Sequence, residues 1–185
     1  MNKTLVGIIV AGVVAVLAAI SMRNTVVALH ENGLAKWAQV ETVLQRRYDL
    51  IPNLVNTVKG YASHEKGLFE EVARLRSQWA AAKTQTDKAA AAGQLEAGLG
   101  RLLLVAEQYP QLKASENFMG LQTELAGTEN RISVERQRYN EAVRAFNTKI
   151  KLFPWNVFAA RCGFNTDMKY FESVQQAKEA PKVEF

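Results

Sequence analysis

The sequence predicts an all-α protein in which an N-terminal transmembrane helix precedes an elongated antiparallel bundle of long helices, similar to a four-helix bundle. Three observations carry this prediction. An apolar stretch near the N-terminus has no charge, apolar residues recur at helical spacing through most of the remaining chain, and only four prolines occur in 185 residues. Strong helix formers such as Ala, Leu, Glu, Gln, Lys and Arg dominate the periodic stretches, and no convincing strand alternation is present.

The apolar stretch spans residues 5–22 and reads LVGIIVAGVVAVLAAISM. At about 1.5 Å per residue it approaches the hydrocarbon thickness of a bilayer, and Lys3 and Arg23 can snorkel at its ends. A cleaved signal peptide is the alternative, with small residues at Ala18 and Ala19 as a cleavage site. The run exceeds a typical signal core, so we predict an uncleaved anchor over residues 1–27.

Small residues recur at every fourth position of this stretch, at Gly7, Ala11, Ala15 and Ala19. Such a stripe lets two membrane helices approach closely, which predicts a homo-oligomer. The alternative is that alanine is simply common in membrane helices. Basic residues are nearly balanced on the two sides of the stretch, so the sequence leaves the orientation in the membrane open.

The predicted bundle covers residues 28–153 and begins with a long amphipathic helix. Its apolar residues repeat every seventh position at Trp37, Leu44, Ile51 and Val58, with Val40, Leu54 and Tyr61 between them. Pro52 lacks an amide donor and clashes with the preceding turn, so we expect a kink or a restart there, with Asp49 as a cap. The apolar spacing stays in phase through Pro52, which favours a kink over a loop.

Two shorter helices are predicted to follow. Ser63 is the expected N-cap of the first, whose buried stripe is Leu68, Val72, Leu75 and Trp79. Asp87 is a possible cap for the second, which should end before Pro110. Gly98 and Gly100 each weaken that helix by about 1 kcal/mol unless a close neighbour needs the space.

The strongest periodic signal lies in the next segment, which Ser115 caps. Its seven-residue positions are Phe118, Leu125, Ile132, Tyr139 and Phe146. This repeat predicts a helix that runs to Leu152 and packs in a bundle with left-handed crossing, as in a coiled coil.

The last predicted region, residues 154–185, is a short helix and tail packed on the bundle. Its apolar residues Trp155, Val157, Phe158 and Phe164 should cover one end of the bundle. Contact with the bilayer surface or with a partner is the alternative.

Charge and composition exclude several classes of function. The net charge is +5, but basic residues alternate with acids, which is typical of a solvated surface, and we predict no nucleic-acid partner. Cys162 is the single cysteine, so an internal disulfide is excluded. Only two histidines accompany it, and we predict no metal site and no cofactor.

The sequence also argues against an enzyme. Glu70 and Glu71 are adjacent and point to different faces of a helix, so they do not form an acid/base pair. His64 lies at a predicted helix start, where a surface role is the ordinary one. No nucleotide-binding, zincin or serine-hydrolase motif occurs. A peripheral enzyme that uses His64 with a nearby carboxylate is kept as an alternative.

Polar residues beside the apolar seam suggest a buried ion pair. Glu129 and Asn130 lie between Leu125 and Ile132, two of the seven-residue positions. Arg46 and Arg47 lie near Pro52. An arginine that reaches Glu129 across the bundle would offset the cost of burying both charges and fix the helix register. The alternative is a polar pocket that receives a partner's peptide.

Two long segments, KWAQVETVLQRRYDLIPNLVNTVKGYASHEK and ASENFMGLQTELAGTENRISVERQRYNEAVRAFNTKIKLFP, together with the terminal APKVEF, resemble the LemA family of bacterial membrane proteins. The resemblance spans residues 37–185 and implies a helical bundle tethered to the cytoplasmic membrane, with no agreed activity and no catalytic residues to carry over. Positions that match the family pattern include Arg46, Arg47, Asp49, Pro52, Asn53, Glu129, Asn130, Tyr139, Asn140 and Asn147.

The family's genes often neighbour genes for membrane metalloproteases or other envelope-maintenance proteins, so the resemblance implies a membrane-protein partner. We therefore expect a single-pass scaffold or adaptor of the bacterial inner membrane without catalytic activity. A protein that binds or shapes a lipid surface is the alternative, based on the basic charge and the aromatic C-terminal segment.

Overall fold

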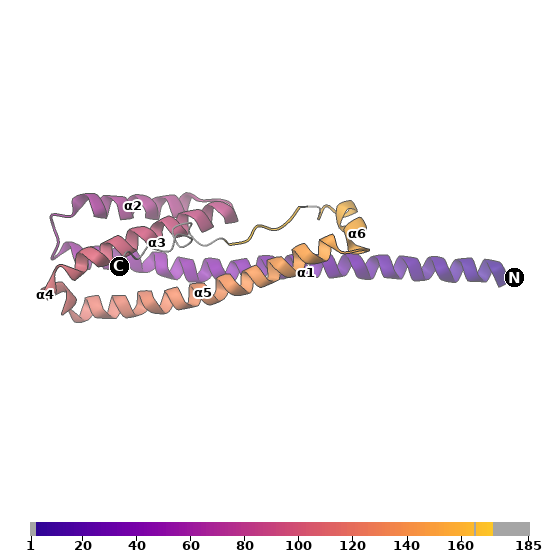
Figure 1. The fold of residues 1–185 in the computed structure, drawn as a ribbon, viewed down its shortest axis with the longest axis horizontal. Coiled ribbons are helices and arrows are strands. Elements are labelled where there is room, and N and C mark those ends of the chain that lie inside the picture. Colours follow the sequence, from indigo (N-terminus) through magenta and orange to yellow (C-terminus); the bar gives the residue numbers. More distant parts are fainter. Residues whose placement is uncertain (1–2, 165, 172–185) are drawn as a thin grey trace, which may run out of the picture. The chain divides into compact units, whose positions relative to one another are not determined.

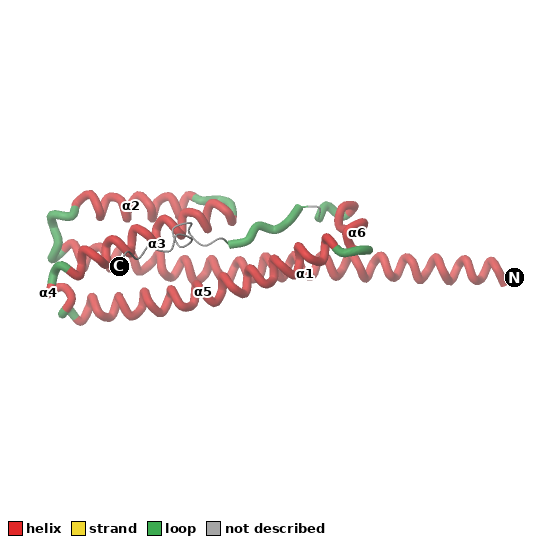
Figure 2. The backbone as a smooth tube through the Cα atoms, viewed as in Figure 1, coloured by secondary structure: helices red, strands yellow, loops and turns green. Residues whose placement is uncertain are grey.

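The computed structural model describes residues 3–164 and 166–171, and all regular structure in these ranges is helical (Figure 2). The helices follow one another as labelled in Figure 1: α1 (Lys3–Lys59), α2 (Lys66–Ala81), α3 (Gln85–Glu107), α4 (Pro110–Lys113), α5 (Glu116–Lys151) and α6 (Trp155–Arg161). The predicted all-α fold class with a long apolar N-terminal helix is confirmed.

The described chain forms two compact units. Unit 1 combines residues 3–38 with 137–170, and unit 2 combines residues 39–136 with Phe171. Residues of both α1 and α5 therefore belong to both units. The predicted division into anchor, bundle and C-terminal segment is drawn along the sequence and stays a prediction.

The core of unit 2 is built from apolar stripes on α1, α2, α3 and α5, closed by Leu112 of α4. Ile51, Leu54 and Val58 are buried as the periodicity predicted. Tyr61 is not: it is exposed and Ala62 is buried instead, because α1 ends at Lys59 and the chain turns there. On α2, Phe69 is buried and Leu68 only partly so.

The predicted caps of the two shorter helices are wrong. Helix α2 begins at Lys66 after Glu65, and no side chain caps it, so Ser63 lies outside the helix. Helix α3 is capped by Thr84, whose hydroxyl oxygen accepts a hydrogen bond from the Asp87 amide. Asp87 instead accepts a bond from the Thr84 hydroxyl, so it lies in the first turn rather than at the cap.

Pro52 does not divide the first helix, since α1 continues through it to Lys59. The sequence left a kink or a restart open at this position, and the continuous helix excludes the restart. Asp49 is therefore not a cap, and its carboxylate accepts a hydrogen bond from Gln45 Nε2 at 2.8 Å. The reason is the in-phase apolar stripe. Ile51 and Leu54 are buried on either side of the proline, and their packing holds both parts of the helix although one backbone bond is lost.

Helix α5 follows its prediction closely. It begins at Glu116, directly after Ser115, and ends at Lys151, one residue before the predicted end. All five seven-residue positions are buried: Phe118, Leu125, Ile132, Tyr139 and Phe146. The periodicity therefore identified the packed face of α5 along its whole length.

A second core cluster lies in unit 1. Val26 of α1 packs with Phe146 and Ile150 of α5 and with Ala159 of α6. Trp155 and Phe164 pack against this cluster, as expected of the C-terminal segment. Val157 does not, because it lies on the outer side of α6 with about half of its surface exposed.

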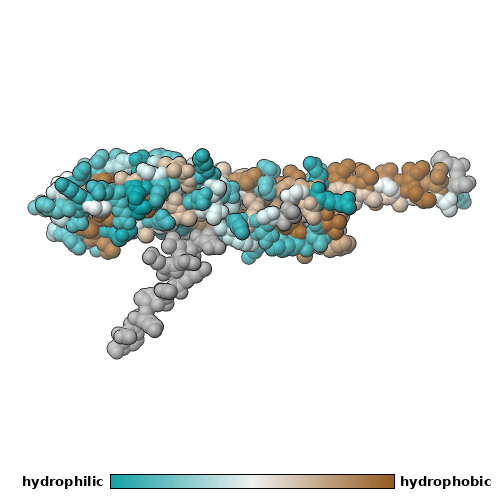
Figure 3. Space-filling view, turned by 90° about the horizontal axis from the view of Figure 1, so that it is seen from above, coloured by the Kyte–Doolittle hydropathy of each residue, from teal (hydrophilic) through white to brown (hydrophobic). Residues whose placement is uncertain are grey.

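The start of α1 has the properties of a membrane span. Among the described residues it is the one helix long and apolar enough to cross a bilayer, by length and composition. Its first residues project their side chains outward without burial, and Figure 3 shows this stretch as a hydrophobic surface.

Candidate functional site

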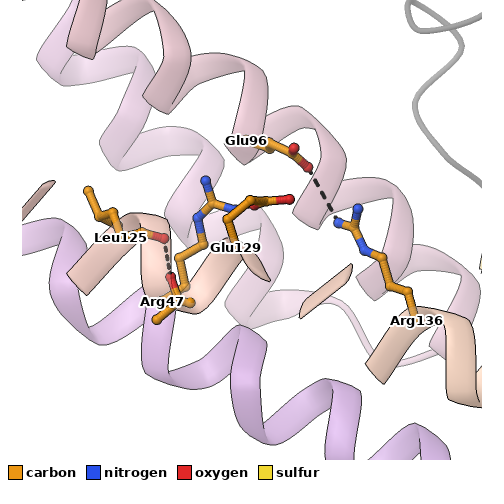
Figure 4. Close-up of polar contacts among 6 residues, drawn as sticks. Arg47, Glu96, Leu125, Glu129 and Arg136 are labelled. Carbon is orange, nitrogen blue, oxygen red and sulfur yellow. Dashed lines mark hydrogen bonds and ion pairs between the residues drawn. The ribbon is translucent and has the colours of Figure 1, made fainter. Parts of the chain in front are cut away.

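An ion pair joins α1 to α5 inside unit 2. The guanidinium of Arg47 donates to the carboxylate of Glu129, as Figure 4 shows. The Arg47 side chain is 15% exposed and that of Glu129 is 37% exposed. The arginine is thus largely desolvated and needs its partner, which fixes the register of the two helices. The predicted link from an arginine to Glu129 is confirmed, and Arg47 provides it.

A second pair lies beside the first and was missed by the sequence analysis. Arg136 of α5 donates to Glu96 of α3 at 3.4 Å (Figure 4). Arg136 follows Glu129 by seven residues and therefore lies at the same edge of the seam. That spacing was the available signal, but nothing in the sequence indicated Glu96 as the partner.

Aromatic side chains next to the Arg47–Glu129 pair connect α1 to α2. The rings of Tyr48 and Trp79 lie 4.7 Å apart, and the guanidinium of Arg76 lies 4.3 Å from the centre of the Tyr48 ring. A guanidinium in this position gains a cation–π attraction. These contacts join helix α2 to α1.

Several of these side chains line a small pocket, whose walls are Leu44, Arg47, Tyr48, Trp79, Ala92, Leu95, Glu96 and Arg136. It has space for roughly one water molecule. The Nε atoms of Arg47 and Arg136 are buried and have no hydrogen-bond partner in the part of the chain that the structure describes. A water fits this site, whereas a peptide side chain does not, so the arrangement favours a structural role.

In unit 1, two side chains of α5 hold an extended segment, residues 166–170. The Tyr139 hydroxyl donates to the carbonyl of Lys169 at 2.8 Å. The Asn147 amide nitrogen donates to the Met168 carbonyl at 2.9 Å, and its oxygen accepts from the Met168 amide at 2.8 Å. Burial raises the pKa of the Tyr139 hydroxyl, which keeps it protonated and able to donate.

The other side of this segment rests on α1. A Cβ added to Gly33 would lie 2.8 Å from Cε of Met168, so the methionine occupies the space that a larger residue would need. The rings of Trp37 and Tyr139 lie 5.4 Å apart and complete the contact. Gly33 carried no sequence signal, because a glycine within a helical pattern does not reveal which segment approaches it.

The remaining predicted positions are dispersed. Arg46, Asp49, Asn53 and Asn130 are exposed, while Pro52 and Asn140 are partly buried. His64 is exposed in the turn after α1 and makes no hydrogen bond or ion pair with any described residue. In the N-terminal stripe, Gly7, Ala11 and Ala15 are exposed and Ala19 is partly buried, so the predicted helix pairing stays a prediction.

The fold and these contacts define a helical protein with one candidate membrane span and with polar pairs that fix helix register. Residues 36–185 match the family model of the LemA family. The chain belongs to the LemA family.

Three curated relatives are similar to this chain over most of its length. Magnetosome protein MamQ 2 of Paramagnetospirillum magneticum is 31% identical over 88% of this chain and 70% of its own length. Magnetosome protein MamQ of Magnetospirillum gryphiswaldense is 27% identical over 91% of this chain and 72% of its own. Protein LemA of Metamycoplasma hominis is 25% identical over 78% of this chain and 64% of its own.

Proposed function

We propose that this protein is a single-pass, membrane-anchored scaffold or adaptor of the bacterial cytoplasmic membrane, without a catalytic reaction of its own. One observation carries the proposal. Helix α1 is uninterrupted from an exposed apolar stretch into the residues that supply core to both units, such as Val26 and Leu54. A chain built in this way joins a bilayer directly to a folded helical surface.

The exposed polar residues of α1 in unit 2 support an adaptor role. Arg46, Asp49 and Asn53 share one face of the helix, because they are separated by three and four residues. All three are exposed, and none contributes to the core, so this polar face is free to contact a partner. The partner that we propose is another membrane protein of the envelope, such as a membrane metalloprotease.

The anchor is tested by alkaline extraction and intact mass. We expect the full chain to stay in the membrane pellet after carbonate treatment and to retain its mass of 20.6 kDa. Loss of residues up to Ala19, together with release into the soluble fraction, would identify a cleaved signal instead.

The adaptor role is tested by photocrosslinking in intact cells of the native host. A photoreactive residue at Asn53 should give a discrete product with one membrane protein. The same residue at Gln78, which is exposed on α2, is the matched control and should give no such product. Recovery of the bare protein alone from both positions would contradict the adaptor role, and a product of twice the mass would indicate self-association.

A further inference from the structure

Large apolar side chains are exposed where α5 turns into α6. Phe153 is 79% exposed, and Leu152 and Val157 are each about half exposed. Trp155 is partly buried beside them. We call Leu152, Phe153, Trp155 and Val157 the apolar turn. Such a group of residues on a folded surface marks a contact with another apolar phase or molecule.

The apolar turn lies level with the end of the candidate span, and both belong to unit 1. Helices α1 and α5 are antiparallel there, since Trp37 meets Tyr139 while Val26 meets Phe146 and Ile150. Going on from Ile150 to Phe153 therefore leads back along α1 from Val26 toward Met22, where the apolar stretch ends. In Figure 1, α6 lies beside α1 just where its unaccompanied N-terminal stretch begins.

Charge is distributed to match a membrane surface. Residues 3–30 and 142–166 contain no Asp or Glu, although the whole chain has 18 acidic residues. Their basic residues are Lys3, Arg23, Arg144, Lys149, Lys151 and Arg161. Basic side chains next to a span attract anionic lipid headgroups. The acidic residues, by contrast, lie outside these two segments.

One contact joins a basic side chain to an aromatic residue of the apolar turn. The ammonium nitrogen of Lys149 lies 3.6 Å from the centre of the Trp155 ring. Lys151 pairs with Asp167, which partly offsets its charge, so Lys149 and Arg161 are the more available cations. Tryptophan beside a basic side chain is typical of the interface between hydrocarbon and headgroups.

We propose that the apolar turn inserts into the headgroup region of the same bilayer that holds α1, as a second membrane contact of unit 1. This inference rests on the proposed anchoring by α1. A lipid surface fits the turn better than a protein partner for two reasons. The turn lies at the level where the span ends, and the segments 3–30 and 142–166 contain basic residues but no Asp or Glu.

The test uses the full chain in vesicles of phosphatidylcholine and phosphatidylglycerol. In a Cys162→Ser background, Phe153→Cys is labelled with a polarity-sensitive fluorophore, and spin-labelled lipids act as quenchers near the headgroups. Tyr170→Cys is the matched control, because it is also an exposed aromatic position of unit 1. Its neighbour Lys169 is bonded to Tyr139, about 20 Å along α5 from Phe153 at about 1.5 Å per residue.

We expect the label at 153 to shift to the blue and to lose most of its emission to the quencher, while the label at 170 does neither. Vesicles of phosphatidylcholine alone should reduce the quenching at 153. Leu17→Cys, labelled in the apolar stretch, reports the anchor separately. An unquenched label at 153 with a quenched label at 17 overturns the inference and leaves the anchor intact.

Two other outcomes also overturn the inference. Labels at 17 and 153 that are both unquenched remove the anchor as well. Equal quenching at 153 and 170 shows that the contact is not confined to the apolar turn. Circular dichroism of each variant identifies any loss of helix, and the exposure of Phe153 makes such a loss unexpected.

Discussion

Individual polar side chains, buried or partly buried, connect α5 to its neighbours in each unit. Arg47 and Glu129 join α5 to α1 in unit 2, while Tyr139 and Asn147 join it to an extended segment in unit 1. Each of these four side chains makes at least one hydrogen bond, and a buried polar group without a partner lowers stability. Apolar contacts alone would allow α5 to slide along its neighbours, and these polar contacts fix its register.

Arg47→Met should destabilise the protein by about 1–2 kcal/mol, because it leaves the Glu129 carboxylate without its charged partner. The loss is moderate because Glu129 is itself partly solvated. Arg46→Met is the matched control at an exposed position and should change the free energy of unfolding by less than about 0.5 kcal/mol. Urea unfolding in detergent measures both. A double-mutant cycle with Glu129→Gln should show coupling for Arg47 alone, and equal coupling for Arg46 would refute the pairing.

Tyr139→Phe should lower the free energy of unfolding by about 1 kcal/mol, because the Lys169 carbonyl loses its donor. Tyr61→Phe, at an exposed tyrosine, should have little effect. Circular dichroism during chemical unfolding provides the measurement. A loss of the same size at both positions would show that the hydrogen bond is not its source.

The raised pKa of Tyr139 predicts that the free energy of unfolding depends on pH. Burial raises the pKa of folded Tyr139, whereas the unfolded chain ionises it near its ordinary value of about 10. The folded state therefore holds the proton more tightly, and its contribution is complete below about pH 10 and is lost as the pH rises through the folded pKa. Unfolding curves at increasing alkaline pH should show this loss in the wild type and a smaller one in Tyr139→Phe.

At the scale of elements, α2 and α3 approach closely at Gly98. A Cβ on Gly98 would lie 2.8 Å from Cδ1 of Leu75, whereas a Cβ on Gly100 would meet no atom within 4 Å. The two glycines thus look alike in the sequence and differ in the fold. Gly98 is buried where α2 needs the space, and Gly100 faces solvent.

This difference predicts that alanine affects the stability of the protein differently at the two positions. Gly100→Ala should stabilise the protein by about 0.5–1 kcal/mol, because alanine has the higher helix propensity and the site is open. Gly98→Ala should be less stable than Gly100→Ala, because Leu75 must move. Thermal unfolding of the two variants in one buffer gives the comparison, and equal gains would contradict a close approach at Gly98.

At the scale of the whole molecule, one candidate span leads into two folded units. Among the described residues, no helix other than α1 has the length and hydropathy to cross a bilayer. If α1 crosses once, then every residue beyond the span lies on the same side of the membrane. Cys162 is exposed and gives direct access to this question.

We expect a membrane-impermeant maleimide to give the same labelling result at two cysteines in intact cells. One is native Cys162, and the other is Leu104→Cys in a Cys162→Ser background, at an exposed site of α3. Both should react or both should be protected, and both should react after permeabilisation. Reaction of one alone would show that the chain crosses the membrane more than once.

The amino-acid sequence was enough to predict the long helices, the packed face of α5, the apolar N-terminal stretch and an arginine partner for Glu129. These features follow from local periodicity and composition, because a helix that buries one face must repeat its apolar residues at a helical spacing. Periodicity identifies the face that is buried but not the group that covers it.

The tertiary contacts were needed to identify Glu96 as the partner of Arg136 and Met168 as the residue beside Gly33, and to exclude a restart of α1 at Pro52. An extended segment such as residues 166–170 has no helical period that could identify its partner. The packing of Ile51 and Leu54 outweighed the local preference of proline, since long-range burial contributes more than a single lost backbone bond.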